Sequence, residues 1–429
     1  MRKGRLDTSL YISNRKKLLT NFKKNAVAVI YSNDEMHRSG DQNYKYRQSS
    51  DLFYLTGINQ ERTTLVIVPD HPDEKLREIL FIRKSDSNLE IWQGHKLTIQ
   101  EAGDISGIAT VKWDDELDSF LREQLVRFDT ICIDVPEYPK YKPDTPFRSQ
   151  RLLKEMREDY PLHHFERLFP VIAKQRQIKQ PLEIDAIKKA CRITAGGFAR
   201  ILKLVRPGMF EYQIEAELTR EFIMNGATGH AYLPIIASGK NACILHYITN
   251  NEVCKDGDLL LMDFGAEYAN YSSDLSRTIP VNGKFSKRQR DLYDATLRVF
   301  RFAKGIMKPG TTINKIHKEV CQKWEEEHIH LGLYTKQDVK NSRKGEPLWS
   351  KYYMHGTSHF MGLDVHDTGG KDDELKPGMI ITCEPGIYIA EEKTGIRLEN
   401  DILITDNGNI DLMSDIPIEP EEIEQIINK

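Results

Sequence analysis

An ungapped internal repeat places acidic residues at matching positions in the chain. Residues 255–265 read KDGDLLLMDFG, and residues 376–386 read KPGMIITCEPG. Each copy consists of a lysine, a turn, a glycine, an apolar run, an acid, one further residue and a glycine. Asp263 and Glu384 therefore hold the same position in the two copies. We expect two related halves, packed about a pseudo-two-fold axis, that bring their acids together.

A second acid follows each copy of the repeat. Asp274 lies eleven residues after Asp263, and Glu399 lies fifteen residues after Glu384. Both lie in strand-like sequence, where a carboxylate is costly to bury unless it is paired or bound to a cation. One such acid would be explained by a strand end or by an ion pair with a neighbouring arginine. Four acids in duplicated positions favour a shared site.

The charge of such a site indicates its cofactor. Four carboxylates in a small volume shift each other's pKa strongly unless a cation compensates them. Two divalent ions about 3.5–4 Å apart, bridged by carboxylates, would compensate the negative charges. A water molecule between the two ions would then be activated as a nucleophile. Carboxylate-rich ligation with few imidazoles suits Mn²⁺, and Co²⁺ and Zn²⁺ stay open as alternatives. We therefore expect two divalent metal ions per chain.

Histidines accompany both copies of the repeat. His355, His359 and His366 lie within twelve residues, and His246 precedes the first copy as His366 precedes the second. Three imidazoles beside a carboxylate cluster indicate at least one metal ligand among them. The sequence has no HExxH, GxSxG, P-loop or GxGxxG motif, so zincin, α/β-hydrolase and nucleotide-binding functions lack their usual support.

The elements that must position these residues follow from periodicity and helix-end signals. Around the repeat we expect strands at 259–262 and 379–383 and helices at 181–205 and 287–307. The second helix begins at a capping box formed by Ser286 and Gln289. Residues 331–353 are polar and weakly periodic, which predicts a long surface connection with little function. The last eleven residues, 419–429, predict a short helix or a frayed end.

The first part of the chain has a different pattern. Apolar β-branched runs alternate with helical patterns, which predicts an α/β domain with a mainly parallel or mixed sheet. The runs lie at 26–31, 65–68, 79–82 and 130–133, and one helix is expected at 113–125. The pattern breaks at RQIKQP, residues 176–181. We therefore place an N-terminal domain at 1–175 and a catalytic domain at 176–429, in an overall α/β (α+β) fold.

Composition limits the partners. The 429 residues carry a formal charge of −3, from 61 Lys and Arg against 64 Asp and Glu, so the basic field of a nucleic-acid-binding protein is missing. No run approaches the roughly 18 apolar residues of a membrane-spanning helix. The N-terminus lacks a signal peptide's apolar region, and the six cysteines form no CxxC pair. We expect a cytoplasmic protein with no nucleic-acid or membrane partner.

The combined motifs resemble the metallopeptidase family with the pita-bread fold, which includes aminopeptidase P, prolidase, methionine aminopeptidase and the metal-free creatinase. The similarity is greatest to the aminopeptidase P branch and extends into the first part of the chain. It rests on YRQSSDLFYLTG at 46–57, MDFG at 262–265, SDLSRT at 273–278, HGTSHFMGLDVHD at 355–367, CEPGIYI at 383–389 and RLENDI at 397–402. The resemblance implies an N-terminal creatinase-like domain before a pita-bread domain with duplicated halves.

The resemblance also implies a set of metal ligands. Asp263 would bind one metal ion and His359 the other. Asp274 and Glu399 would bridge both ions. Glu384 would join the ion bound by His359, and would accept the proton of the attacking water. All five positions hold the residue types of the family pattern.

The remaining family positions concern the substrate. His246, His355 and His366 would orient the peptide and support the developing oxyanion. Arg397, two residues before Glu399 on an expected common strand face, would brace that bridging carboxylate or meet the substrate, with a structural ion pair as an equal alternative. Tyr232 would join His246 and His366 in a wall around a proline ring.

The implied activity is that of an exopeptidase that releases the N-terminal residue from peptides with proline in the second position. A prolidase, which cleaves only Xaa-Pro dipeptides, is the main alternative. A methionine aminopeptidase would not need so large an N-terminal domain, and a non-catalytic binding protein would be expected to lack a ligand. A homodimer or homotetramer is implied, with the N-terminal domain shaping access and assembly. Trp92 would reach a neighbouring subunit, or else lie partly buried in its own core.

Overall fold

The computed structural model describes residues 4–20, 22–138, 143–342 and 347–429. The chain forms two compact units. The N-terminal unit comprises Arg5–Arg176, and the C-terminal unit comprises Gln177–Lys429 together with Gly4. Among the described residues, no helix has the length and apolar character that crossing a membrane requires.

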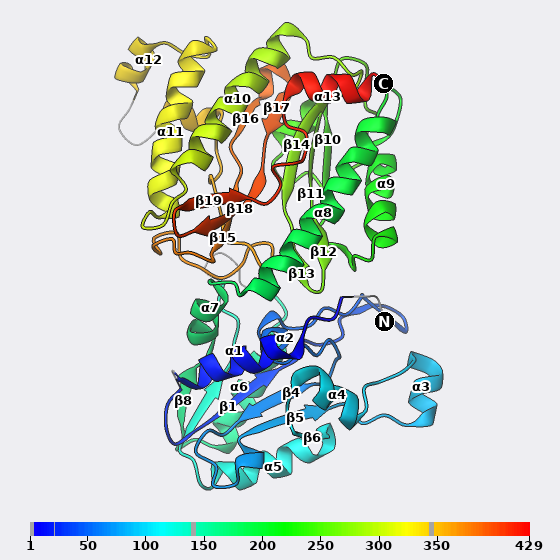
Figure 1. The fold of residues 1–429 in the computed structure, drawn as a ribbon, viewed down its shortest axis with the longest axis vertical. Helices are drawn as coiled ribbons and strands as arrows, with labels where there is room; N and C mark the ends of the chain where they lie inside the picture. Colours follow the sequence, from blue (N-terminus) through cyan, green and yellow to red (C-terminus); the bar gives the residue numbers. More distant parts are fainter. Residues whose placement is uncertain (1–3, 21, 139–142, 343–346) are drawn as a thin grey trace. The chain divides into compact units, whose positions relative to one another are not determined.

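The N-terminal unit is built on a mixed sheet of six strands in the order β6-β5-β4-β1-β7-β8 (Figure 1). Their bounds are β1 (Ala26–Tyr31), β4 (Thr64–Ile67), β5 (Glu78–Ile82), β6 (Thr110–Trp113), β7 (Thr130–Ile133) and β8 (His164–Arg167). Strand β1 runs parallel to β7 and antiparallel to β4. The mixed sheet confirms the predicted fold class of this part of the chain.

Helices and a small hairpin complete this unit. The helices are α1 (Thr8–Thr20), α2 (Ser50–Thr56), α3 (Ser87–Gln93), α4 (Ile99–Ser106), α5 (Leu117–Leu125), α6 (Arg148–Asp159) and α7 (Phe169–Arg176). The hairpin is β2 (His37–Ser39) with β3 (Gln42–Asn43). The helix expected at 113–125 begins later, at Leu117, because Trp113 ends strand β6 and residues 114–116 form a 3₁₀ turn.

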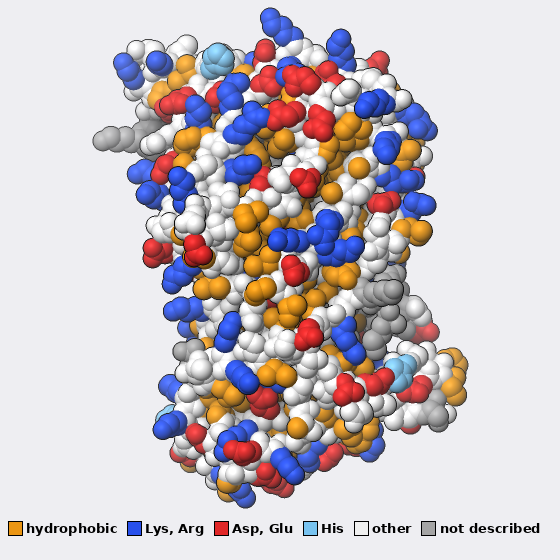
Figure 2. All heavy atoms as spheres, in the orientation of Figure 1, with side chains coloured by type: hydrophobic (Ala, Val, Ile, Leu, Met, Phe, Trp, Pro, Cys, Tyr) orange, Lys and Arg blue, Asp and Glu red, His pale blue; other side chains and the backbone are white. Residues whose placement is uncertain are grey.

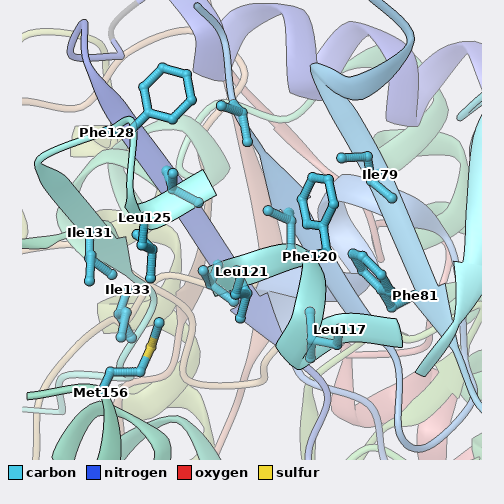
Figure 3. Close-up of a cluster of buried hydrophobic side chains, with 14 of the residues drawn as sticks. Ile79, Phe81, Leu117, Phe120, Leu121, Leu125, Phe128, Ile131, Ile133 and Met156 are labelled. Carbon is cyan, nitrogen blue, oxygen red and sulfur yellow. The ribbon is translucent and has the colours of Figure 1, made fainter. Parts of the chain in front are cut away.

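One core cluster of the N-terminal unit lies between the sheet and α5. Every residue of β1 is buried, because AVAVIY places apolar side chains on both faces of a central strand. Figure 3 shows Leu117, Phe120 and Leu121 of α5 directed toward the sheet. The rings of Phe81 and Phe120 have centroids 5.5 Å apart. This packing explains why the apolar runs of the sequence indicated the strands correctly.

The C-terminal unit contains the repeat in two sets of strands. The first set comprises β9 (Gly229–His230), β10 (Ile235–Ser238), β11 (Leu259–Phe264), β12 (Ala266–Tyr268), β13 (Tyr271–Ser272) and β14 (Leu275–Pro280). The second set comprises β15 (Ile380–Cys383), β16 (Gly386–Ile389), β17 (Thr394–Arg397), β18 (Asn400–Thr405) and β19 (Gly408–Asp411). In the first copy β11 pairs antiparallel with β14, and in the second β15 pairs antiparallel with β18. The two copies thus form corresponding strand pairs.

Helices cover these strands. They are α8 (Pro181–Leu204), α9 (Glu211–Met224), α10 (Lys287–Ile306), α11 (Ile313–His330), α12 (Lys336–Asn341) and α13 (Pro420–Ile427). Figure 1 shows α8 and α9 on one side of the strands and α10 and α11 on the other. Helix α10 begins at the predicted capping box of Ser286 and Gln289. Helix α8 can pack closely on α9 because Gly197 has no side chain. A Cβ at that position would lie only 2.8 Å from the ring of Phe222.

The polar segment 331–353 differs from the prediction of a plain surface connection. It contains α12 and a 3₁₀ turn at Leu348–Lys351, while residues 343–346 lie outside the described part. Its last two residues, Tyr352 and Tyr353, are buried. The phenol ring of Tyr353 lies edge-on to the imidazole of His355, with centroids 4.9 Å apart. The end of the segment therefore supports a candidate site residue. The prediction missed this role because it judged the 23 residues by their average polarity.

Candidate metal centre

The four acids of the repeat lie at the ends of strands in the C-terminal unit. Asp263 is the second-last residue of β11, and Glu384 follows β15. Asp274 lies between β13 and β14, and Glu399 lies between β17 and β18. The expectation that Asp274 and Glu399 lie inside strands is therefore wrong. Each occupies a short link between two strands, where the chain changes direction and the side chain can turn toward the centre.

Three of the predicted ligands meet closely. Asp274, His359 and Glu399 offer ligand atoms that all lie within 4.8 Å of one another. Nε2 of His359 is 3.5 Å from Oδ2 of Asp274 and 3.8 Å from Oε1 of Glu384. Nδ1 of His359 lies 3.0 Å from the carbonyl oxygen of Phe360, and donates to it. In the neutral ring the proton therefore lies on Nδ1, and Nε2, which is directed at the carboxylates, is the nitrogen that would bind a metal ion.

Asp263 is joined to the same group through Tyr232. The Tyr232 hydroxyl lies 2.6 Å from Oδ1 of Asp263 and also contacts Oδ1 of Asp274. Burial and then the two neighbouring carboxylates raise the pKa of Tyr232 well above its usual range, so it stays a neutral donor. The other oxygen of Asp263, Oδ2, accepts from Nη2 of Arg397.

Arg397 links two of the acids. Its Nε donates to Oγ of Ser276 at 2.9 Å, and that hydroxyl donates to Oε2 of Glu399 at 2.7 Å. Arg397 ends β17 and Glu399 lies beyond that strand, so the predicted common strand face does not exist. The guanidinium reaches Glu399 through Ser276, and reaches Asp263 directly.

The electrostatics of these acids test whether a cation fits the site. Burial raises the pKa of Glu384 to about 7, with the charges of His359 and Asp274 acting in opposite directions. Burial, followed by repulsion from Asp274 and Glu384, raises the pKa of Glu399 well above its usual range. Buried carboxylates that repel one another in this way are stabilised as anions by a divalent cation. Oxygen-rich donors with one imidazole therefore fit the predicted metal ions.

One cavity of about 360 Å³ collects every predicted site residue. Its lining includes the ten side chains Tyr232, His246, Asp263, Asp274, His355, His359, His366, Glu384, Arg397 and Glu399. The rest of the lining is apolar and consists of Leu233, Ile235, Leu245, Ile248 and Val365. Cavities of this size are typical of binding sites for small ligands, and the ten polar side chains supply the chemistry here.

The other histidines have distinct settings. His355 Nε2 lies 2.9 Å from the Tyr388 hydroxyl, and Nδ1 lies 2.7 Å from the Gly356 carbonyl oxygen. Burial, and then the charge of Arg397, lowers the pKa of His355 to about 3, so its ring is neutral. The ring of His366 lies edge-on to that of His359, with centroids 4.4 Å apart. His246 is exposed to solvent.

The sequence interpretation missed residues that support the ligands. Thr382 Oγ1 accepts from the His359 backbone N–H at 3.1 Å. Asp401 Oδ2 accepts from the Asp274 backbone N–H at 3.1 Å, and burial raises the pKa of Asp401 well above its usual range. Thr382, Ser276 and Asp401 each lie two residues from a predicted ligand. This closeness to a predicted ligand was the signal that the sequence offered for these three residues.

The duplicated strands and this donor set define the class of a metal-dependent hydrolase with a buried, carboxylate-rich centre. Residues 185–406 match Metallopeptidase family M24, and residues 11–132 match the Aminopeptidase P, N-terminal domain. The chain belongs to metallopeptidase family M24. The predicted family, fold class and enzyme class are thereby confirmed.

Known relatives extend over nearly the whole chain. The chain is 36% identical to a Xaa-Pro aminopeptidase of Escherichia coli K12, with 96% of each protein covered. It is 28% identical to human Xaa-Pro aminopeptidase 3, with 98% of this chain and 86% of the human protein covered. Its structure matches E. coli aminopeptidase P with the inhibitor Pro-Leu (TM-score 0.88, 33% identity, 99% of both chains). It also matches Pseudomonas aeruginosa aminopeptidase PepP (TM-score 0.90, 30% identity, 99% and 98% coverage).

Proposed function

We propose that this protein is a Xaa-Pro aminopeptidase, which releases the N-terminal residue from peptides with proline in the second position. The observation that carries the proposal is the convergence of five metal-ligand side chains and three further histidines on one cavity. Relatives named Xaa-Pro aminopeptidase, similar along nearly their full length, support the substrate class. The solved E. coli aminopeptidase P binds the dipeptide inhibitor Pro-Leu, which carries a proline.

The five ligand side chains would hold two divalent ions. Asp263 would bind one ion, His359 and Glu384 the other, and Asp274 and Glu399 both. When bound, such ions polarise a peptide carbonyl and supply a nucleophilic water near neutral pH. We propose Mn²⁺ as the physiological metal, because oxygen donors outnumber the single imidazole.

Glu384 would serve as the general base and then as the general acid. Its carboxylate takes the proton of the attacking water and returns it to the leaving amine of proline. Oε2 of Glu384 lies 3.6 Å from Nδ1 of His355. Thr382 Oγ1 lies 3.5 Å from Oε1 of Glu384, and the Glu384 backbone N–H donates to the Thr357 carbonyl at 3.0 Å. These contacts fix the carboxylate in the cavity.

His355 would present a defined tautomer to the substrate. Arg397 Nη1 donates to the Tyr388 hydroxyl oxygen at 2.9 Å, so the Tyr388 hydroxyl proton is directed to Nε2 of His355. The imidazole proton then lies on Nδ1, next to the Gly356 carbonyl. Because both ring nitrogens are engaged, we propose that His355 supports the oxyanion side of the site by positioning Tyr388 and Glu384 and does not donate a proton of its own.

The proline ring would lie against His246, His366 and Tyr232, and Leu233 and Ile248 add apolar surface to the same cavity. The free α-amine of the substrate would bind on the Asp263 side, which gives an exopeptidase its need for a free N-terminus. Arg397 forms an ion pair with Asp263 and donates to Ser276, so we assign it the bracing role.

A peptide-length series separates this activity from that of a prolidase. We expect hydrolysis of Xaa-Pro-Yaa-Yaa peptides, with release of the first residue. Hydrolysis of Xaa-Pro dipeptides alone would make the protein a prolidase instead. Metal binding with no hydrolysis of either peptide would favour a non-catalytic homologue.

The N-terminal unit is proposed to serve access and assembly, as a domain separate from the catalytic one. Trp92 in α3 is 87% exposed, so it is not the partly buried core residue of the alternative interpretation. An exposed tryptophan beside the exposed Ile91 suits contact with a neighbouring subunit in a homodimer or homotetramer. Analytical ultracentrifugation of wild type and of Trp92→Ala tests this assignment.

A cytoplasmic location is proposed as well. All six cysteines are free thiols, which suits a reducing compartment. Figure 2 shows basic and acidic side chains interspersed over the visible face. Such a mixture does not favour nucleic acid, and the relatives named Xaa-Pro aminopeptidase favour peptides as the proposed partners. Cell fractionation tests the location directly.

A further inference from the structure

Strand β10 lies at the edge of the sheet β10-β11-β14, and side chains bind its outer edge. The Ile236 backbone N–H donates to Oδ1 of Asn250 at 3.0 Å. The Ser238 backbone N–H donates to Oε1 of Glu211 at 2.7 Å. Edge strands usually leave such groups to solvent or to another strand. Here two side chains take the place of a neighbouring strand.

Glu211, the first residue of α9, is fully buried and accepts five hydrogen bonds. The donors are the Ser238 N–H (2.7 Å), the Ser238 hydroxyl (2.7 Å), the Asn241 amide (3.2 Å), the Tyr247 hydroxyl (2.8 Å) and the Glu252 N–H (3.0 Å). A buried carboxylate is costly unless its lone pairs are filled, and the first turn of a helix also favours a negative charge. Both oxygens of Glu211 are satisfied as acceptors.

All five donors belong to residues 238–252, the segment that carries His246 and Ile248 into the cavity lining. Residues 244–252 contain no helix or strand, and His246 itself is exposed. Backbone pairing therefore does not hold His246 in place. The nearest firm anchor is the adjacent Tyr247, whose side chain is buried and ends on Glu211.

Asn250 forms a second anchor on the same helix. Its amide donates to Oε2 of Glu215 at 2.8 Å and to the Pro234 carbonyl at 2.9 Å. Glu211 and Glu215 lie one turn apart on α9, so they share a face of that helix. Asn250 has a left-handed backbone (φ 48°), which asparagine tolerates better than most residues. The two glutamates hold both ends of the segment.

We infer that Glu211 is a positioning residue that sets the place of His246 in the substrate cavity by anchoring residues 238–252 to α9. Glu211 does not line the cavity and acts through Tyr247 and its neighbours. The inference rests on the proposed function only in assigning His246 to substrate. Every one of these five groups donates a hydrogen bond to Glu211. Glutamine would replace one carboxylate oxygen by an N–H₂ group, which cannot accept, so the donors at that oxygen would lose their partner.

The test compares Glu211→Gln with a matched control, Glu183→Gln. Glu183 is also a buried glutamate at the start of a helix, and it accepts from the Tyr271 hydroxyl at 3.0 Å and the Gln180 N–H at 2.9 Å. It has no bond to residues 238–252 among its described partners. Each substitution is combined with His246→Ala, and kcat/KM is measured on a Xaa-Pro-Yaa-Yaa peptide with the metal content checked.

We expect Glu211→Gln to lower kcat/KM by roughly tenfold to a hundredfold, as displaced active-site groups do. The double variant with His246→Ala should be no slower than His246→Ala alone, to within about twofold, whereas the Glu183→Gln effect, if any, should multiply. Tyr247→Phe, which removes one donor, should give a smaller loss of the same kind and serves if Glu211→Gln does not fold. Losses that multiply with His246→Ala would overturn the inference.

Hydrogen exchange separates this inference from the proposed function, because it needs no turnover. The bonded amides of the anchored region, those of Ile236, Ser238 and Glu252, should lose protection by about tenfold or more in Glu211→Gln and should keep it in Glu183→Gln. That result supports the anchor even if the wild type hydrolyses no Xaa-Pro peptide, an outcome that would instead sink the proposed function. Unchanged protection in Glu211→Gln would overturn the anchor.

Discussion

The Arg397 guanidinium donates to the Asp263 carboxylate, although the two residues are 134 positions apart and belong to different sets of strands, Asp263 to β11 and Arg397 to β17. Both side chains are largely buried, with 5% and 14% exposed. The same guanidinium bonds Ser276 and Tyr388, so one cation joins both halves of the site.

Arg397→Met should therefore be strongly destabilising. Removing one partner of a buried pair leaves the other uncompensated, which costs about 3–5 kcal/mol. Urea unfolding should show this loss in the metal-free protein. Arg288→Met is the control, because its pair with Glu392 is partly exposed and should contribute less than about 1 kcal/mol. Equal losses in the two variants would contradict the assigned role of Arg397.

Ser276→Ala should weaken metal binding with little change in fold. The Ser276 hydroxyl orients Glu399 and receives Arg397, and loss of such a supporting group typically costs about 10–100-fold in metal affinity. Competition with a chelator would measure the affinity. The control is Ser106→Ala. Ser106 is also a buried serine, but it lies in the N-terminal unit and its hydroxyl donates to the Ala102 carbonyl, so this substitution should leave metal affinity unchanged. An unaltered affinity in Ser276→Ala would remove Ser276 from the support of the centre.

His366→Ala should lower kcat far more than metal content. His366 lines the cavity and packs on His359, yet His359 directs its Nε2 at the acids. We expect a loss of about 10²–10⁴-fold in kcat, the range for groups that assist proton transfer or oxyanion stabilisation. Elemental analysis should find the metal content of wild type. Unchanged turnover would remove His366 from the mechanism.

The free energy of unfolding should decrease as the pH is lowered, because of His328. This imidazole is buried against Trp324 and Tyr352, and burial lowers its pKa to about 3 from an ordinary 6.5. Between those values the unfolded chain binds a proton that the native chain does not, so the free energy of unfolding decreases as pH falls from about 6.5. His328→Phe should reduce that slope by up to about 1.4 kcal/mol per pH unit. Urea titrations at several pH values would measure it.

The exposed His330 on the same helix provides the control. His330→Phe should leave the slope of wild type. If His328→Phe and wild type lose stability equally as the pH is lowered, the assignment of a neutral, buried His328 in the folded protein is wrong.

The sequence predicted what depends on local pattern and on duplication. The strand at 26–31 and the start of α10 followed from the apolar run and the capping box. The ten site residues came from the repeat, the histidines and the family resemblance, and the structure brings them to one cavity. Their individual roles stay predictions.

The contacts that were missed are long-range. Asp401 serves Asp274 across 127 positions, and Glu211 serves Tyr247 across 36. Asp401 lies near the predicted ligand Glu399, but its partner is Asp274, in the other half of the site. The sequence around a buried acid does not show which distant group the acid binds. The segment 331–353 was underrated for a related reason: its two buried tyrosines follow many exposed polar residues.

Metal stoichiometry measured together with turnover tests the central claim most directly. The metal-stripped protein is titrated with Mn²⁺, and the bound ions per chain are counted while hydrolysis of a Xaa-Pro-Yaa-Yaa peptide is followed. We predict two ions per wild-type chain, with hydrolysis appearing as they bind, and fewer than two in Glu399→Gln. A wild-type protein that binds no Mn²⁺ even in excess Mn²⁺ would contradict this claim. Full hydrolysis by the metal-free protein would contradict it as well.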